Sequence, residues 1–383
     1  TEEVLFDMDA IQLHEVLNGK YRIIPTIEIT EENLKLLYTP GVADVAKLCA
    51  ENPEKTFVHT RRKHTIAVLS DGSAVLGLGN IGPYGALPVM EGKAVLFKQF
   101  GDLEAFPICI DTQDVEEIIN LVKALEPSFG GINLEDISAP RCFEILERLN
   151  NEMNIPVFHD DQQGTAVVVV AGLLNALKLA EKKIEDVKIV VNGIGAAGYN
   201  IVKLLMEIGA KHIVPCDING IINRKTALHK YHLEISELTG NLNNSGNLKD
   251  AITGADVFIG VSKGGILTGS YIMAMNEKPI IFALANPIPE IFPDEAYKNG
   301  AFIVATGRSD FPNQVNNLLA FPGIMKVAVE KQIKITKEML IRAAEILSNV
   351  IEPKKECILP KATDRRVHDE LYYGLLQFVN SII

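Results

Sequence analysis

The stretch KIVVNGIGAAGYNIVKLLMEIGAKHIVPCD (188–217) decides the fold of the second half of the chain. It contains a buried strand, a glycine-rich turn, an amphipathic helix and a second buried strand, the pattern of a parallel βαβ unit. The turn has the form GxGxxG, and a helix N-terminus after such a turn favours anions such as a pyrophosphate. Asp217 stands 24 positions after Gly193, where a carboxylate can accept hydrogen bonds from ribose hydroxyls. We therefore expect a dinucleotide site made of Gly193, Gly195, Ala196, Ala197, Gly198 and Asp217. The alternative is a tight strand–helix turn without a ligand.

Three more apolar runs follow the quoted stretch, with helical periodicity between them. They are ADVFIGV (255–261), PIIFALA (279–285) and AFIVATG (301–307). With the two quoted strands, they predict a doubly wound parallel sheet of about five strands. We therefore expect residues 163–351 to form a Rossmann-like dinucleotide-binding domain in a protein of the α/β class.

The part of the chain before residue 163 also predicts α/β structure. Its apolar runs predict strands at 64–70, 73–79, 94–100, 106–111, 131–137 and 156–161. Asp71-Gly72 predicts a hairpin between the first two of these strands, and Thr30 is a plausible N-cap for a helix at 31–38. We expect residues 1–162 to form a substrate and metal domain, with the helices of 352–383 packing back against it.

Composition and charge exclude several classes of function. The chain has 383 residues and a formal net charge of −12, which argues against binding to nucleic acid or to an anionic membrane surface. The longest apolar run, 166–174, is far shorter than the ~20 residues that span a bilayer. The five cysteines of the chain show no zinc-site spacing and no disulfide framework, which favours a cytoplasmic location.

A second GxGxxG pattern occurs at Gly77, Gly79 and Gly82. It also follows a predicted strand, but Pro83 and Pro88 argue against a long helix after it. We therefore interpret it as a backbone turn in a substrate domain, with a second nucleotide site as the alternative.

Carboxylates follow two of the predicted strands. Glu135-Asp136 ends one strand and Asp160-Asp161 ends another. Because ligands gather at the carboxyl ends of parallel strands, these side chains can converge, and they would then repel unless a cation or a shared proton neutralised them. Hard oxygen ligands suit Mg²⁺ or Mn²⁺. The competing interpretation is two solvated loop ends that carry helix N-caps.

Several single residues are ambiguous by themselves. Lys93 precedes an apolar run, Tyr38 precedes a proline turn, and Asn286 and Asn317 follow predicted strands. A lone lysine is usually a surface residue, a tyrosine at a helix end usually packs, and asparagines after strands usually form turns. His159, next to the acidic pair, is more simply a packed residue than a metal ligand.

Taken together, these motifs are far more specific than any of them alone. The chain strongly resembles the malic enzyme family, particularly its short prokaryotic-type members, from about Tyr38 to Gly323. The motifs that carry the resemblance are YTPGV, LGLGNIGPYGALPVMEGKAVLFK, NLEDI, FHDDQQGTA, NGIGAAG, ALANPIPE and QVNNLLAFPG, in that order.

The resemblance implies oxidative decarboxylation of L-malate to pyruvate and CO₂, with reduction of NAD or NADP and a requirement for Mn²⁺ or Mg²⁺. It also implies a homodimer. By the resemblance, Lys93 is the general base and contacts malate, Tyr38 is the general acid, and Asp160 is a carboxylate close to the lysine.

The remaining matched positions concern the metal and the substrate. The resemblance assigns Glu135, Asp136 and Asp161 to the metal, and Asn286 and Asn317 to malate. Larger animal-type members carry an arginine before the glycine turn at 77–82, where this chain has Val75. The amides of that turn and the asparagines are candidates to replace the arginine.

Two further functions compete with this one. The first is a non-decarboxylating dehydrogenase of the amino-acid or methylenetetrahydrofolate type, which would not need the carboxylate pairs. The second is a nicotinamide-binding sensor without turnover. For the dinucleotide, Asp217 would repel a 2′-phosphate and Ile218-Asn219 supplies no cation, so we expect NAD rather than NADP.

Overall fold

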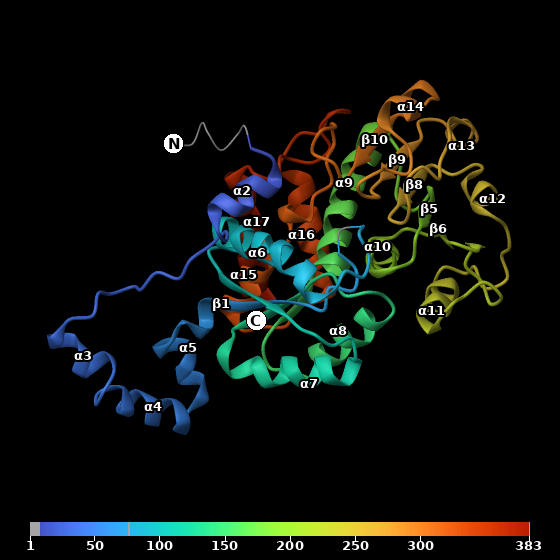
Figure 1. Cartoon of the computed structure of the whole chain (residues 1–383). Helices are drawn as coiled ribbons and strands as arrows, with labels where there is room; N and C mark the ends of the chain where they lie inside the picture. Colours follow the sequence, from blue (N-terminus) through green and yellow to red (C-terminus); the bar gives the residue numbers. More distant parts are fainter. Residues whose placement is uncertain (1–7, 76, 383) are drawn as a thin grey trace.

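The computed structural model describes residues 8–75 and 77–382 and contains two sheets (Figure 1). The first sheet has the order β2-β1-β3-β4 and is parallel throughout. Its strands are β1 (Thr65–Ser70), β2 (Glu104–Cys109), β3 (Gly131–Leu134) and β4 (Val157–His159). The two-domain α/β class predicted from the sequence is confirmed.

The second sheet has the order β10-β9-β8-β5-β6-β7, parallel except for the short antiparallel β7. Its strands are β5 (Lys188–Asn192), β6 (His212–Asp217), β7 (Gly220–Ile221), β8 (Val257–Gly260), β9 (Ile280–Ala283) and β10 (Ile303–Thr306). The five predicted strands are present, and β7 is an addition. The strand order reverses between β5 and β8, which is the switch point where doubly wound sheets bind ligands.

Successive residues of this second sheet face two different cores. Ile189 and Val191 join the large core that also contains the first sheet, whereas Val190 joins a smaller core on the other face. This alternation follows from the two-residue repeat of a strand. Helices α11 (Lys230–Leu238), α12 (Leu248–Ile252), α13 (Gly269–Met273) and α14 (Pro293–Lys298) complete this half of the chain.

The predictions for the region after β1 were wrong. No hairpin forms at Asp71-Gly72, because β1 pairs in parallel with β2 and β3. The run at 94–100 is not a strand but the second half of helix α6 (Gly82–Gly101), which buries Met90, Ala94 and Phe97 at helical spacing. Pro83 lies in the first turn, where its missing N–H leaves no helical hydrogen bond unmade, and the helix continues through Pro88 in its interior.

Helices cover the first sheet and connect it to the second. Helices α7 (Val115–Leu125) and α8 (Arg141–Glu152) pack against each other, and α9 (Thr165–Ala180) packs against α10 (Ala196–Glu207) and α16 (Lys337–Asn349). The stretch 160–180 is long and apolar enough for a membrane span, but 78% of its apolar window is buried inside the protein, as expected of a core helix.

The C-terminal helix returns to the first half of the chain. Helix α17 (Arg365–Ile382) packs against α15 (Phe321–Lys331) and α16, and it also contacts α6. The large core therefore runs without a break from the first sheet through α9 to the second sheet.

The N-terminal helices differ from the rest of the molecule. Helices α2 (Ala10–Leu17), α3 (Glu31–Leu37), α4 (Val42–Glu51) and α5 (Thr56–His59) bury no residue. The predicted helix at 31–38 is confirmed as α3, with the Thr30 hydroxyl accepting a hydrogen bond from the Asn33 amide. Figure 1 shows α3 and α4 extending away from the two sheets.

Candidate active site

Three carboxylates meet at the carboxyl edge of the first sheet. Glu135 and Asp136 follow β3, and Asp161 follows β4 in a single π-helical turn at 160–164. Each offers an oxygen within 4.8 Å of the oxygens of the other two. The Asp136 amide donates to Asp161 Oδ2 over 2.7 Å, which ties the two strand ends together. These carboxylates are the three that the resemblance assigns to the metal.

The electrostatics of this cluster fit a divalent cation. Burial, followed by repulsion from neighbouring carboxylates, raises the pKa of Asp136 to about 9 and that of Asp161 to about 6. Burial also raises the pKa of Glu135 to about 7, against the attraction of Lys93. Asp136 Oδ2 is buried without a hydrogen-bond donor among the described residues. Buried, mutually repelling hard oxygen ligands are the donor set that Mg²⁺ and Mn²⁺ take.

Lys93 is buried between this cluster and Asp160. It comes from the middle of α6, and its Nζ lies 2.5 Å from Asp160 Oδ2, 3.1 Å from Glu135 Oε1 and 4.2 Å from the centre of the Phe321 ring. Burial lowers the pKa of this ammonium, but the attraction of Asp160 and Glu135 outweighs burial, so the pKa is raised. Lys93 is therefore charged as long as these carboxylates are ionised.

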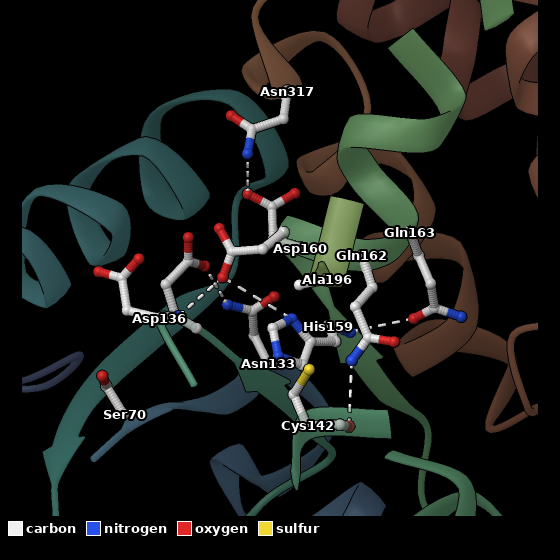
Figure 2. Close-up of polar contacts among 12 residues, drawn as sticks. Ser70, Asn133, Asp136, Cys142, His159, Asp160, Gln162, Gln163, Ala196 and Asn317 are labelled. Carbon is white, nitrogen blue, oxygen red and sulfur yellow. Dashed lines mark hydrogen bonds and ion pairs between the residues drawn. The ribbon is translucent and has the colours of Figure 1, made fainter. Parts of the chain in front are cut away.

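Asp160 links the lysine to the other half of the chain. It is fully buried, and burial raises its pKa to about 7 despite the opposing charge of Lys93. Asn317, at the start of a short turn before α15, donates from its side-chain amide to Asp160 Oδ2. Figure 2 shows Asn317 pointing directly at Asp160. The structure thus brings Lys93, Asp160 and Asn317 together.

Asn286 lies next to the glycine turn at 77–82, in contact with Gly77. It follows β9 and is exposed, and its backbone carbonyl presses on Gly77, where a Cβ atom would come within 2.4 Å of it. Gly77 has φ of +75°, which favours glycine. The first GxGxxG is therefore a backbone turn that contacts the loop of the predicted malate ligand Asn286. Among the described residues, no hydrogen bond joins the Asn286 side chain to Lys93.

His159 is the packed residue that the sequence favoured. Its ring is fully buried, and neither ring nitrogen has a hydrogen-bond partner among the described residues. Its Nδ1 lies 3.8 Å from Asp161 Oδ2. Burial, with a smaller effect of Lys93, lowers the pKa of the imidazole to about 3, so it is neutral.

The sequence did not indicate the ion pair between Arg141 and Asp71, which lies near the carboxylate cluster. Arg141, at the start of α8, donates to the fully buried Asp71 over 2.9 Å and to the Ser73 hydroxyl over 2.9 Å. The Ala74 amide donates to the Asp136 carbonyl over 3.0 Å, so this network fixes the backbone of Asp136, one of the three predicted metal ligands. From the sequence, Asp71-Gly72 predicted a hairpin turn. Nothing in the sequence indicated that the Asp71 side chain is buried.

The turn at 193–198 has the geometry of a phosphate cradle. A Cβ atom at Gly198 would lie 1.9 Å from the Gly193 carbonyl, whereas one at Gly195 would meet nothing within 4 Å. Helix α10 starts at Ala196, and no side chain caps its N-terminus among the described residues. The open space and the free amides fit a pyrophosphate.

Asp217 lies directly beside this turn at the end of β6. Its Oδ2 accepts a hydrogen bond from the Ile194 amide over 2.9 Å, and its Oδ1 accepts one from the Ile218 amide over 2.7 Å. Asp217 therefore also braces the turn, a structural role that the sequence did not indicate.

Gln162 couples the two sites. It belongs to the turn at 160–164; its amide nitrogen donates to the Cys142 carbonyl over 3.0 Å, and its oxygen accepts from Asn200 of α10 over 2.9 Å. Figure 2 shows Gln162 pointing at Cys142. Gln162 thus links the carboxylate segment at 160–164 to α8 and to α10, the helix of the predicted dinucleotide turn.

Tyr38 is the one predicted catalytic residue that the chain does not bring to this cluster. It ends α3, its side chain is 67% exposed, and α3 lies on the far side of the molecule from the second sheet (Figure 1). Among the described residues, no hydrogen bond joins Tyr38 to Lys93 or to any of the four carboxylates.

Two family models match most of the chain. The malic enzyme N-terminal domain matches residues 18–150, and the malic enzyme NAD-binding domain matches residues 162–368. Two curated relatives are a NAD-dependent malic enzyme of Geobacillus stearothermophilus and a bifunctional malic/malolactic enzyme of Bacillus subtilis. The first is 52% identical over 94% of this chain and 77% of its own length. The second is 50% identical over 94% of this chain and 89% of its own length.

Solved structures show the same similarity. The NAD-dependent malic enzyme of Thermotoga maritima is 63% identical and superposes with a TM-score of 0.94 over 96% of this chain and 99% of that one. The malic enzyme of Pyrococcus horikoshii is 45% identical, with a TM-score of 0.91 over 95% of this chain and 87% of that one. The carboxylate cluster beside a buried lysine, the dinucleotide turn and these matches together show that the chain belongs to the malic enzyme family.

Proposed function

We propose that this chain oxidises and decarboxylates L-malate to pyruvate and CO₂ with NAD as the hydride acceptor, in a reaction that requires Mg²⁺ or Mn²⁺. The observation that supports this most strongly is the position of Lys93, whose buried Nζ lies within 3.1 Å of both Glu135 and Asp160. An ammonium at this position can hold a dianionic substrate and can exchange protons with it.

Glu135, Asp136 and Asp161 are the residues that would hold the cation. When bound, the cation supplies a Lewis acid for the C2 oxygen of malate and stabilises the negative charge that develops as CO₂ departs. The turn amides at 77–82, together with Asn286 and Asn317, take the place of the arginine that is missing at Val75 and bind the malate carboxylates.

Lys93 acts as the base for the C2 hydroxyl. It must first lose a proton, and Asp160 Oδ2 at 2.5 Å is the acceptor within reach; a cation bound beside the ammonium would lower the pKa of Lys93, which the carboxylates alone raise. The neutral amine then takes the hydroxyl proton while the C2 hydride moves to the nicotinamide. After the C3–C4 bond breaks, its electron pair remains as the enolate of pyruvate, and Tyr38 donates a proton to C3.

The turn at 193–198 binds the pyrophosphate of the cofactor, and Asp217 binds the ribose. A second negative charge at the 2′ position would lie against this carboxylate, which favours NAD over NADP. In this arrangement residues 163–351 bind the dinucleotide, and residues 1–162 with 352–383 bind malate and the cation. We also propose that the protein works in the cytoplasm as a homodimer.

A steady-state assay tests this function. Malate is supplied with NAD or NADP, with and without Mn²⁺, and reduced cofactor and pyruvate are both quantified. Equal amounts of the two products that depend on Mn²⁺ support the proposal. Reduced cofactor without pyruvate would indicate a non-decarboxylating dehydrogenase instead, and no turnover would indicate a sensor.

A further inference from the structure

Strands β8 and β9 are neighbours in the second sheet, and the chain segments that follow them part and then pair again (Figure 1). Where the strands end, the Leu284 amide donates to the Gly260 carbonyl over 2.9 Å. Pairing resumes where the Gly265 amide donates to the Pro289 carbonyl over 2.9 Å. Between these two points, no backbone hydrogen bond joins the two segments among the described residues. The amides along this interval therefore need other acceptors.

The side chain of Glu290 folds back into this interval and supplies them. Its Oε1 accepts a hydrogen bond from the Ser262 amide over 3.2 Å, and its Oε2 accepts one from the Ala285 amide over 3.0 Å. Glu290 is fully buried, and a Cβ atom at Gly260 would lie 2.5 Å from its Oε1. No cation pairs with it among the described residues. Backbone amides alone thus hold a buried carboxylate, one from each segment.

The segment after β8 is packed against the dinucleotide turn at 193–198. The Ser262 hydroxyl accepts a hydrogen bond from the Asn192 side chain over 2.8 Å. A Cβ atom at Gly193 would lie 2.7 Å from Ser262 Cβ and 2.9 Å from the Val261 carbonyl. The position of Ser262 is therefore tied to the position of this turn.

The segment after β9 carries the proposed malate ligand. Ala285, whose amide Glu290 holds, directly precedes Asn286. The Asn286 carbonyl presses on Gly77, and a Cβ atom at Gly307 would lie 2.8 Å from Asn286 Nδ2. Asn286 is therefore closely surrounded, and the peptide bond before it is fixed by the Glu290 carboxylate.

We infer that Glu290 is a positioning residue of the reaction. By holding one amide of each segment, its carboxylate sets the spacing between Asn286 and the dinucleotide turn, and so between malate and the nicotinamide. This inference rests on the proposed function, which places malate at Asn286 and the cofactor at 193–198. Hydride transfer needs reacting atoms ~3–3.5 Å apart, and a misplacement of ~1 Å can cost ~10²-fold in rate. Glu290 acts only through the two segments and contacts neither reactant.

The chemistry of the contact requires a carboxylate. Two amide N–H groups face one side chain, and an ionised glutamate offers an acceptor oxygen to each of them. A glutamine of the same shape has a single oxygen, and its NH₂ group would face the second amide, donor against donor. Glu290→Gln therefore keeps the volume of the side chain and releases one of the two segments.

Glu290→Gln tests the inference, with Mn²⁺ present and with malate that carries hydrogen or deuterium at C2. We expect kcat/KM for malate to fall by about 10²-fold. The deuterium isotope effect on kcat/KM should stay at or above the wild-type value, because the hydride step is the one that slows. The Kd of NAD, measured by calorimetric titration, should stay near that of the wild type, because Asp217 still braces the turn.

Two further variants complete the test. Glu295→Gln is the matched control, because Glu295 is an exposed carboxylate that accepts a single amide, that of Gly269 over 3.3 Å. It should leave all three quantities unchanged. Glu290→Asp keeps the charge but is one methylene shorter and cannot reach both amides, so it should act in the same direction as Glu290→Gln. It takes the place of Glu290→Gln if that variant does not fold.

The outcomes separate this inference from the proposed function. A wild-type protein that makes no pyruvate from malate overturns the proposed function. An active wild type overturns the role of Glu290 alone if a folded Glu290 variant keeps its kcat/KM, shows a smaller isotope effect, or loses NAD affinity as strongly as it loses kcat/KM. If neither Glu290 variant folds, Glu290 supports the fold as a whole, and the positioning role is likewise overturned.

Discussion

The two GxGxxG turns of this chain have the same sequence pattern and different surroundings. Both follow a strand inside a parallel sheet and lead into a helix, β1 into α6 and β5 into α10. At 193–198, Gly198 lies against the Gly193 carbonyl, so α10 starts at once and its free amides face open space. At 77–82 the turn is longer, and Gly77 presses on the Asn286 loop instead.

The difference shows that the pattern encodes a tight backbone path and not a ligand. The second turn ends in a helix N-terminus that can bind an anion. The first turn contacts the other half of the chain and starts a helix whose important residue, Lys93, comes three turns later. In the proposed function, both turns offer backbone amides to an anion, but only the turn at 77–82 also positions the helix that carries Lys93.

The largest effect on activity is expected for substitution of Lys93, which α6 positions. Lys93→Ala removes the proposed base and leaves Asp160 and Glu135 without their cation, so kcat for malate oxidation should fall by at least the roughly 10²–10⁴-fold of a lost general base. Lys98→Ala, on the exposed side of the same helix, is the control and should keep nearly full activity. Similar kcat values for the two variants would remove Lys93 from the chemistry.

Glycine substitutions compare the two turns directly. Gly195 has ordinary backbone angles and open space, so Gly195→Ala should keep the melting temperature and weaken NAD binding through the methyl group alone. Gly77→Ala should instead raise the KM for malate and leave the Kd of NAD unchanged, because its Cβ atom would collide with the Asn286 carbonyl. Calorimetric titration of NAD with each variant separates the two effects. Equal losses of NAD affinity would show that the turns do not differ in function.

The carboxylate cluster should couple metal binding to pH. The raised pKa values of Glu135, Asp136 and Asp161, about 7, 9 and 6, mean that protonation stabilises the metal-free protein, and that this stability falls as pH rises from about 4, the ordinary pKa of these groups, through 6 to 9. Mn²⁺ replaces those protons, so the increase in melting temperature on adding Mn²⁺ should grow from pH 6 to pH 9. Asp161→Asn should flatten this dependence and raise the Mn²⁺ requirement. An increase that is constant with pH would place the cation elsewhere.

The smallest effect is expected at Asp217. Asp217→Asn keeps the shape of the side chain and removes its charge, so the ratio of kcat/KM for NAD to that for NADP should fall several-fold. Since Asp217 also accepts a hydrogen bond from the Ile194 amide, the melting temperature should be recorded alongside as a measure of that structural role. A wild-type preference for NADP would contradict the assignment of this carboxylate.

The sequence predicted those parts of the fold that depend on short-range patterns. The strands of the second sheet, the helix at 31–37 with its Thr30 cap and the acidic ends of β3 and β4 all follow from local periodicity and capping. Periodicity could not separate a strand from a buried helix at 94–100, because an apolar run of seven residues suits both. Only the burial of Met90, Ala94 and Phe97 on one side of α6 shows that this run is helical.

The site itself was predictable in residue types and only partly in geometry. Convergence of Glu135, Asp136 and Asp161 follows from the rule that the carboxyl ends of parallel strands share an edge. The ion pair of Asp71 with Arg141 joins residues 70 positions apart, and the Gln162–Asn200 contact joins residues 38 apart. Such long-range pairs leave no mark in a single sequence. The sequence also does not indicate that Tyr38 lies away from Lys93 within one chain, which only the structure shows.

Chemical rescue tests the central claim, that α6 delivers an amine which removes the proton of the C2 hydroxyl of malate. Pyruvate and NADH formation by Lys93→Ala should be measured with Mn²⁺ at increasing concentrations of ethylamine, with tetramethylammonium as a cation that carries no transferable proton. We predict an inactive variant whose rate rises with ethylamine and with pH and does not respond to tetramethylammonium, because the free amine replaces the missing base. A Lys93→Ala enzyme that turns over near the wild-type rate without any amine would contradict the account.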